Sequence, residues 1–199
     1  MSNDKGRQTT LLVPSDQCRT FIRKMYYEKT KRGLKQWALE EIIATLDARA
    51  RFDGRLEEVF LRVGRTNTGG IEIDLGNDTG KVIRVEVDTK LKLAKPSLKF
   101  IRPKGFGAMA VDGGKPDFGR LWEFINVDDD VDRVLLAGWC LMALNPDGPY
   151  PLLVLQGEQG SAKTTATRIL KALLDPGLGK TRSLPPSERD LFIAAQGNW

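Results

Sequence analysis

Histidine is absent from all 199 residues of the chain. This absence excludes Ser-His and Cys-His nucleophilic machinery and the commonest zinc ligand sets. The two cysteines, Cys18 and Cys140, lie far apart and without metal-binding spacing, so we expect a reducing compartment. The longest apolar run, 134–144, is too short to span a bilayer and predicts a buried helix, and the N-terminus lacks the apolar core of a secretory signal. The sequence therefore predicts a cytoplasmic protein that makes no contact with a membrane.

One stretch of the chain carries a strong chemical signal. Apolar residues 152–155 predict a buried strand, and an apolar stripe through 169–174 predicts a helix that ends at Asp175-Pro176-Gly177. The loop between them has the composition and position of a phosphate-binding loop, also called Walker A. Its nine residues are Gly157, Glu158, Gln159, Gly160, Ser161, Ala162, Lys163, Thr164 and Thr165.

Each residue type in this loop has a chemical reason. Gly157 and Gly160 allow a tight turn and close approach of the backbone to phosphate. The Lys163 ammonium is predicted to contact the β- and γ-phosphates, and the Thr164 hydroxyl to complete a Mg²⁺ shell, whereas Thr165 supports the helix. Ala162 replaces the usual second glycine, and we expect it to keep a negative φ because it opens a helix. The alternative is a chance turn, which the flanking strand and helix patterns disfavour.

The N-terminal part predicts two helices around a basic turn. Apolar periodicity indicates helices over 16–28 and 34–51, and residues 1–15 lack periodicity and predict a disordered lead-in. The second helix is expected to bury the face that carries Leu34, Trp37, Ala38, Ile42 and Leu46. Residues 1–51 hold eleven Lys and Arg against six acids. Two interpretations stay open, a solvated basic face and a nucleic-acid contact through Lys29, Lys31, Arg32 and Lys35.

The middle of the chain predicts a small antiparallel β unit. Alternating runs at 59–63 and 71–75 flank a glycine turn, and the alternation over 83–87 is that of a strand with one solvated face. Residues 81–104 carry eight Lys and Arg against two acids. Lysines that protect a sheet edge are the favoured explanation, and the alternative is a nucleic-acid face that includes Lys90 and Lys92.

These patterns divide the chain into four parts of an α/β protein. They are a lead-in (1–15), a helical hairpin (16–54), a small β domain (55–116) and the start of a P-loop NTPase core (117–199). Within the last part, helices are expected over 117–125, up to residue 144 and over 187–196. Asp128, Asp129 and Asp130 stand where a helix begins, which favours capping over a metal site.

The loop and its surroundings resemble a known family. The run 153–165, with similarity upstream from Pro146 and downstream to Trp199, is similar to helicase-like AAA+ ATPases of phages, plasmids and other mobile elements, often primase-associated. Weaker similarity extends over 50–54, 73–76 and 100–103. The resemblance implies ATP as ligand, DNA replication as the setting, and a ring-shaped homo-oligomer. In that family, alanine before the lysine is a familiar variant.

The resemblance also implies that residues 117–199 are a RecA/AAA+-like α/β core that is incomplete. The strand that carries the Mg²⁺-holding acids would begin at Trp199, so no catalytic residue is assigned in this chain. We expect nucleotide binding with little hydrolysis, and an exposed edge along Leu152–Leu155. The alternative function is a non-enzymatic, basic nucleic-acid-binding protein.

Overall fold

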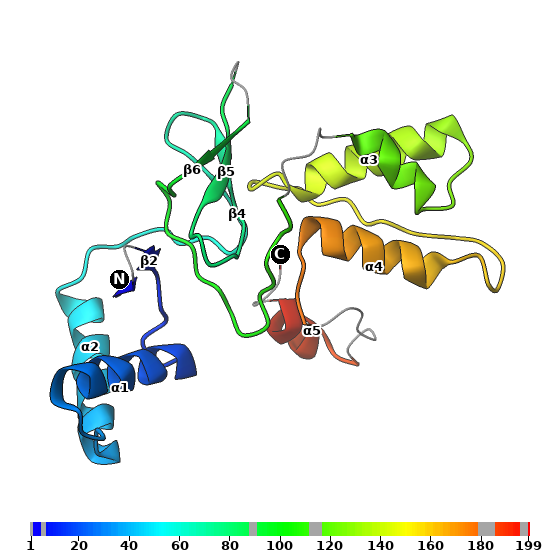
Figure 1. Cartoon of the computed structure of the whole chain (residues 1–199). Coiled ribbons are helices and arrows are strands. Elements are labelled where there is room, and N and C mark those ends of the chain that lie inside the picture. The colour runs from blue at the N-terminus through cyan, green and yellow to red at the C-terminus, as the bar shows by residue number, and fades with distance from the viewer. Residues whose placement is uncertain (1, 5–6, 88–90, 112–116, 179–185, 196–198) are drawn as a thin grey trace. The chain divides into compact units, whose positions relative to one another are not determined.

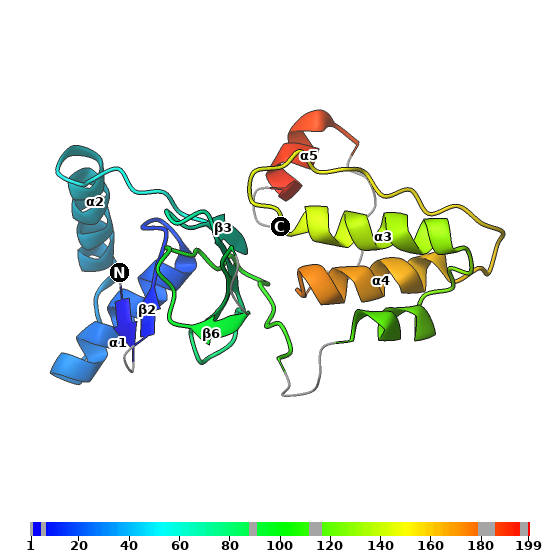
Figure 2. The ribbon, with the colours of Figure 1, turned by 90° about the horizontal axis from the view of Figure 1, so that it is seen from above.

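The computed structural model describes residues 2–4, 7–87, 91–111, 117–178, 186–195 and 199, and shows a mixed α/β chain (Figures 1 and 2). Contacts divide the chain into two compact units. Met1–Phe60 with Lys99–Arg102 form the first, and Leu61–Leu98 with Pro103–Trp199 form the second. The elements are β1 (Ser2–Asp4), β2 (Arg7–Thr9), α1 (Asp16–Thr30), α2 (Gln36–Phe52), β3 (Val63–Arg65), β4 (Ile71–Asp74), β5 (Val82–Val85), β6 (Lys92–Ala94), the 3₁₀ helix η1 (Phe118–Glu123), α3 (Asp130–Ala143), α4 (Lys163–Leu174) and α5 (Glu188–Ala195).

The first unit is a helical hairpin with a short strand pair. Ser15 caps α1 because its side chain accepts a hydrogen bond from the amide of Cys18. The helix ends at Lys31, which adopts a left-handed conformation with φ of 56°. The small core consists of buried Cys18, Leu39 and Ile43, with Leu11, Val13, Ile22 and Leu34 packed against it.

Two predictions for this unit are wrong. The lead-in is not structureless, because β1 and β2 pair antiparallel and Leu11 and Val13 pack on the helices. In α2 the buried pair is Leu39 and Ile43, while Trp37 is 66% exposed. The helix carries two overlapping apolar stripes, and periodicity alone does not decide which of them the neighbouring helix covers.

The second unit contains a four-stranded antiparallel sheet in the order β3-β4-β5-β6. One cross-strand row joins Val63 to Ile73, Ile73 to Ile83 and Ile83 to Leu93. β3 overlaps the predicted run 59–63 only at Val63, and β4 and β5 are each one residue shorter than the predicted runs. One solvated face was expected for 83–87, but residues 83–86 are all half-buried. In β4, Glu72 and Asp74 are buried as well as Ile73.

Glu72 explains how a carboxylate occupies this buried position. Its oxygens accept hydrogen bonds from the Arg84 guanidinium at 2.5 and 2.8 Å, and from the backbone amides of Ser97 and Leu98 at 3.0–3.1 Å. The Ser97 hydroxyl donates a further bond at 2.8 Å. A buried charge is tolerated when it is paired and hydrogen-bonded, so this cluster fixes the 95–98 segment to the sheet.

Arg62 is the second buried charge, and it joins the sheet to the end of α4. Its side chain is fully buried, and Nε and Nη2 donate to the Asp175 carboxylate at 3.0 and 2.8 Å. Further hydrogen bonds go to backbone carbonyls of Asp74, Gly107 and Pro176, and the Phe106 ring stacks 3.6 Å from the guanidinium carbon.

Gly76 makes room for this arrangement. Its φ is +67°, and a Cβ there would lie 2.6 Å from the Gly107 carbonyl oxygen and 3.1 Å from Arg62 Nη1. Only glycine satisfies both the conformation and the space at this position.

The helical part of the second unit packs around a separate apolar cluster. Its buried residues are Ile125, Leu136, Cys140, Ala166, Leu170 and Leu174. Asp129 caps α3 by accepting from two backbone amides, and the described residues contain no group of side chains able to hold a metal ion. The capping interpretation is confirmed for Asp129, and Asp130 lies in the acidic first turn of α3.

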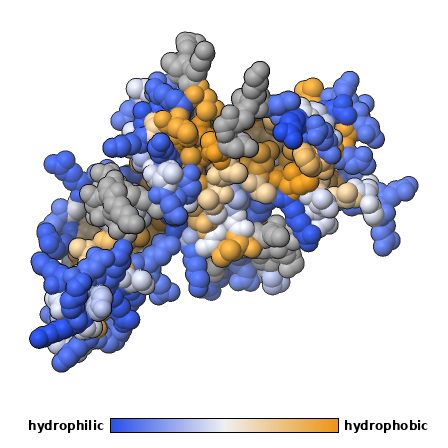
Figure 3. All heavy atoms as spheres, in the orientation of Figure 1, coloured by the Kyte–Doolittle hydropathy of each residue, from blue (hydrophilic) through white to orange (hydrophobic). Residues whose placement is uncertain are grey.

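The prediction that α3 is a buried helix is only partly right. Leu136 and Cys140 are buried, but Val134 and Leu141 are 70% and 72% exposed. Apolar atoms are correspondingly visible at the surface of the second unit (Figure 3). No helix within the described ranges is both long and apolar enough to cross a membrane.

Removal of one partner from the Arg62–Asp175 pair is expected to be strongly destabilising. Arg62→Met leaves the Asp175 carboxylate buried without its main partner, so we expect a loss of about 3–5 kcal/mol in the free energy of unfolding. The matched control, Arg51→Ala, removes the exposed Arg51–Asp47 pair on α2 and should change the value by less than about 0.5 kcal/mol. Urea unfolding measures both, and equal effects would contradict the role given to Arg62.

Candidate phosphate-binding loop

The segment before the loop differs from its predicted form. Leu152–Leu155 belongs to no strand, and all strand pairs in the described part of the chain are antiparallel. Leu153 and Leu155 pack against the apolar cluster of the second unit, whereas Leu152 and Val154 are 93% and 71% exposed. This alternation is typical of an extended chain with one buried face. A ladder partner is missing, because no described strand lies beside it.

Lys163 holds the loop together. Its ammonium donates to the carbonyl oxygens of Gly157 at 2.8 Å and Glu158 at 2.7 Å, and to the Ser161 hydroxyl at 3.1 Å. The side chain of the first residue of α4 therefore reaches back to the start of the loop. In the free chain the carbonyls of residues 157 and 158 face this ammonium, whereas the predicted phosphate-binding form requires loop N–H groups that face an anion.

The two glycines of the loop meet different structural requirements. At Gly157, φ is +154°, and a Cβ would lie 2.6 Å from the Ser161 hydroxyl oxygen. At Gly160, φ is +87°, and no heavy atom lies within 4 Å of the Cβ position. Gly157 permits close packing, and Gly160 provides a left-handed turn that stays open on its outer side.

Ala162 contradicts the expectation of a negative φ. Its φ is +59° at the N-cap of α4, and its side chain makes no capping hydrogen bond. The chain must turn left-handed immediately before the helix, which disfavours a residue with a Cβ. The usual glycine at this position would adopt the same conformation without strain.

The start of α4 supplies further groups for an anion. The first amides of a helix have no intrahelical partner, and the helix dipole places positive potential there. Thr164 and Thr165 are both exposed in this first turn. Thr167 is also exposed, and its hydroxyl donates to the Lys163 carbonyl at 3.0 Å. The start of α4 can therefore present amides and a hydroxyl to a phosphate group, and the ammonium once it exchanges its acceptors in the loop for phosphate oxygens.

The predicted nucleic-acid residues have separate locations. Lys29, Lys31, Arg32 and Lys35 come together in the first unit, around the turn between α1 and α2. Lys92 is half-exposed on β6 in the second unit, with its ammonium 3.7 Å from Glu86. The predicted contact at position 90 lies outside the described residues.

Sequence reasoning missed three contributors. Ser161 was not distinguished from its neighbours, although its hydroxyl contacts Lys163 and occupies the space beside Gly157. Arg62 and Asp175 were not recognised as a pair, because 113 residues separate them and Asp175 was interpreted only as a helix end. An arginine in an apolar strand run was the available signal for Arg62.

The cysteines make no contribution to a reactive site. Burial raises the pKa of both the Cys18 and the Cys140 thiols, so both stay protonated at neutral pH.

Comparison with protein-family models, with curated proteins and with solved structures finds no match for this chain.

The backbone at position 162 gives a test of the loop. Ala162→Gly relieves a left-handed Cβ conformation, so we expect the free energy of unfolding to rise by about 0.5–1 kcal/mol. Ala172→Gly, at an exposed position inside the same helix, should lower it by about 1 kcal/mol. Thermal or urea unfolding shows whether the free energy of unfolding rises or falls in each variant. A loss of stability in both variants would show that residue 162 is not left-handed in solution.

Proposed function

We propose that this chain binds a nucleoside triphosphate with Mg²⁺ in the loop from Gly157 to Thr165. The observation that carries the proposal is the position of the Lys163 ammonium, held by two carbonyls and a hydroxyl of its own loop. The helix that begins at this lysine adds unpaired amides and a positive dipole end.

The residues present fit the chemistry of such a ligand. A triphosphate carries several negative oxygens, which need several donors in a small space. The loop amides and the Lys163 ammonium provide these donors, with the ammonium directed to the β- and γ-phosphates. The Thr164 hydroxyl is the oxygen ligand available for Mg²⁺, which binds phosphates and few protein groups. Bound Mg²⁺ neutralises phosphate charge.

The wider functional class follows from the family resemblance. We propose ATP as the nucleotide, and a role as the ATP-binding module of a replication-associated P-loop ATPase or DNA helicase of a mobile element. DNA and further copies of the chain in a ring are the partners that this proposal implies. The glycine-lysine loop supports the nucleotide, and the resemblance alone supports replication.

Lys163→Ala tests the nucleotide proposal. The wild-type chain with Mg²⁺ and ATP at about 100 times Kd should gain about 2.7 kcal/mol of stability, and Lys163→Ala should gain almost none. Arg168→Ala, an exposed cation later in the same helix, is the control that should retain the gain. Thermal unfolding with and without ATP measures the effect. Equal ligand stabilisation of wild type and Lys163→Ala would contradict the proposal.

Thr164 and Thr165 give a second test, which concerns the metal. Chelation of Mg²⁺ should weaken ATP binding to the wild-type chain. In Thr164→Ala this difference should largely disappear, because the hydroxyl ligand is gone, whereas Thr165→Ala should keep it. Titrations of a fluorescent ATP analogue with and without EDTA measure the four affinities. A metal dependence that is lost in Thr165→Ala and kept in Thr164→Ala would reverse the assignment.

A further inference from the structure

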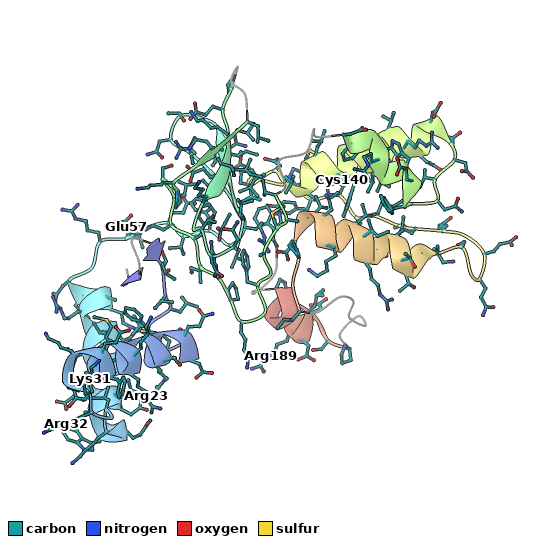
Figure 4. The ribbon with its side chains drawn as sticks, viewed as in Figure 1. Arg23, Lys31, Arg32, Glu57, Cys140 and Arg189 are labelled. Atoms are coloured by element: carbon teal, nitrogen blue, oxygen red, sulfur yellow. The ribbon has the colours of Figure 1, made fainter. Side chains whose placement is uncertain are left out.

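The turn between α1 and α2, together with the helix ends beside it, carries a dense group of positive charges. Residues 23–37 contain six basic side chains and one acid, Glu28, a surplus that equals the formal charge of +5 of the whole chain. Figure 4 shows Arg23, Lys31 and Arg32 on the outside of this helical pair, and hydrophilic colour dominates the same elements in Figure 3. This short segment is therefore strongly basic.

The cations of this turn keep their charge available. Some basic side chains elsewhere are neutralised by carboxylates, as in the Arg84–Glu72 and Lys99–Glu57 pairs. Among the described residues, no carboxylate forms a salt bridge with any of four exposed cations at the turn. These are Lys29, Lys31, Arg32 and Lys35.

Two large aromatic side chains lie exposed beside these cations. Tyr27 is 57% exposed, and the Lys31 ammonium lies 5.7 Å from its ring centre. Trp37, in the first turn of α2, is 66% exposed. Arg23 lies one helical turn before Tyr27 in α1, and its guanidinium donates to Gln36, the residue before Trp37.

The turn is held in a defined conformation. The amide of left-handed Lys31 donates to the Tyr27 carbonyl at 2.8 Å, and the Thr30 hydroxyl donates to the Tyr26 carbonyl at 2.8 Å. The Arg32 amide donates to the Thr30 hydroxyl at 3.2 Å. The backbone that carries the cations is therefore ordered before any ligand arrives, which lowers the entropy cost of binding.

From these observations we infer that this surface binds single-stranded nucleic acid. The surface consists of Arg23, Tyr27, Lys31, Arg32, Lys35 and Trp37. Its cations contact phosphates, and Trp37 and Tyr27 stack on unpaired bases. A duplex hides the faces of its bases, so exposed aromatic rings favour a single strand. The inference is independent of the nucleotide loop, because no residue of that loop takes part.

Trp37→Ala tests the stacking contact in the full-length chain. We expect the affinity for a fluorescein-labelled 20-residue oligo-dT or oligo-rU, measured by anisotropy, to fall about tenfold. Phe52→Ala is the matched control, because Phe52 is an 86% exposed aromatic residue on the same helix, about 22 Å away along its axis. The control should bind as the wild type does. Binding to either oligonucleotide supports the inference, and their ratio distinguishes DNA from RNA.

Lys31→Ala/Arg32→Ala tests the phosphate contacts. Loss of two contacts should reduce the slope of log affinity against log salt by about 1.4. Arg49→Ala/Arg55→Ala removes two exposed cations elsewhere in the first unit and should leave the slope unchanged. A preference for a duplex of the same length, or affinity that is unchanged in Trp37→Ala, would overturn the inference. Binding that is lost only in Lys163→Ala would place the nucleic acid at the loop instead, and also overturn it.

Discussion

The Arg62–Asp175 pair determines where the proposed phosphate loop stands relative to the sheet. Asp175 follows the last residue of α4, and Lys163 is the first residue of the same helix. A helix of 12 residues is a rigid rod about 18 Å long, so fixing one end constrains the other. Asp175 also accepts hydrogen bonds from the Lys171 ammonium and the Trp199 amide. Three segments of the second unit are thus tied to one carboxylate.

The contacts of the Arg62 guanidinium offset the cost of burying its charge. The guanidinium of Arg62 keeps a carboxylate, three backbone carbonyls and an aromatic face as partners, which replace the water it loses. Apolar packing between α3 and α4 would tolerate some sliding of one helix along the other. A directional pair tolerates less, and it therefore contributes orientation as well as stability.

Local signals made much of the fold predictable from sequence. Asp129 caps α3 at the helix start where capping by aspartate was expected, because a cap depends only on the next few amides. The hairpin around Gly69 likewise follows from its turn residues. The phosphate-binding role of the nine-residue loop stays a prediction, made from the spacing of Gly157, Lys163 and Thr164 with alanine at the second glycine position.

Features that depend on distant partners were not predictable. The strand expected at Leu152–Leu155 fails because a strand needs a neighbour, which the segment itself does not reveal. The buried face of α2 and the burial of Glu72 depend on elements far along the chain. Ala162 fails for a different reason, since the path of the loop imposes a conformation that its residue type disfavours.

The three hydrogen bonds of Lys163 have one more consequence. An ammonium group has three protons, and here each finds an acceptor within the loop. The conformational entropy that this long side chain loses on ordering, a cost of about 1.5–2 kcal/mol, is therefore already lost in the free protein. An arriving anion does not have to order the lysine, but it does have to offer better oxygens than two peptide carbonyls and a hydroxyl. Weakly charged ligands would leave these contacts undisturbed, so the proposed phosphate loop would select its ligand by charge density rather than by shape.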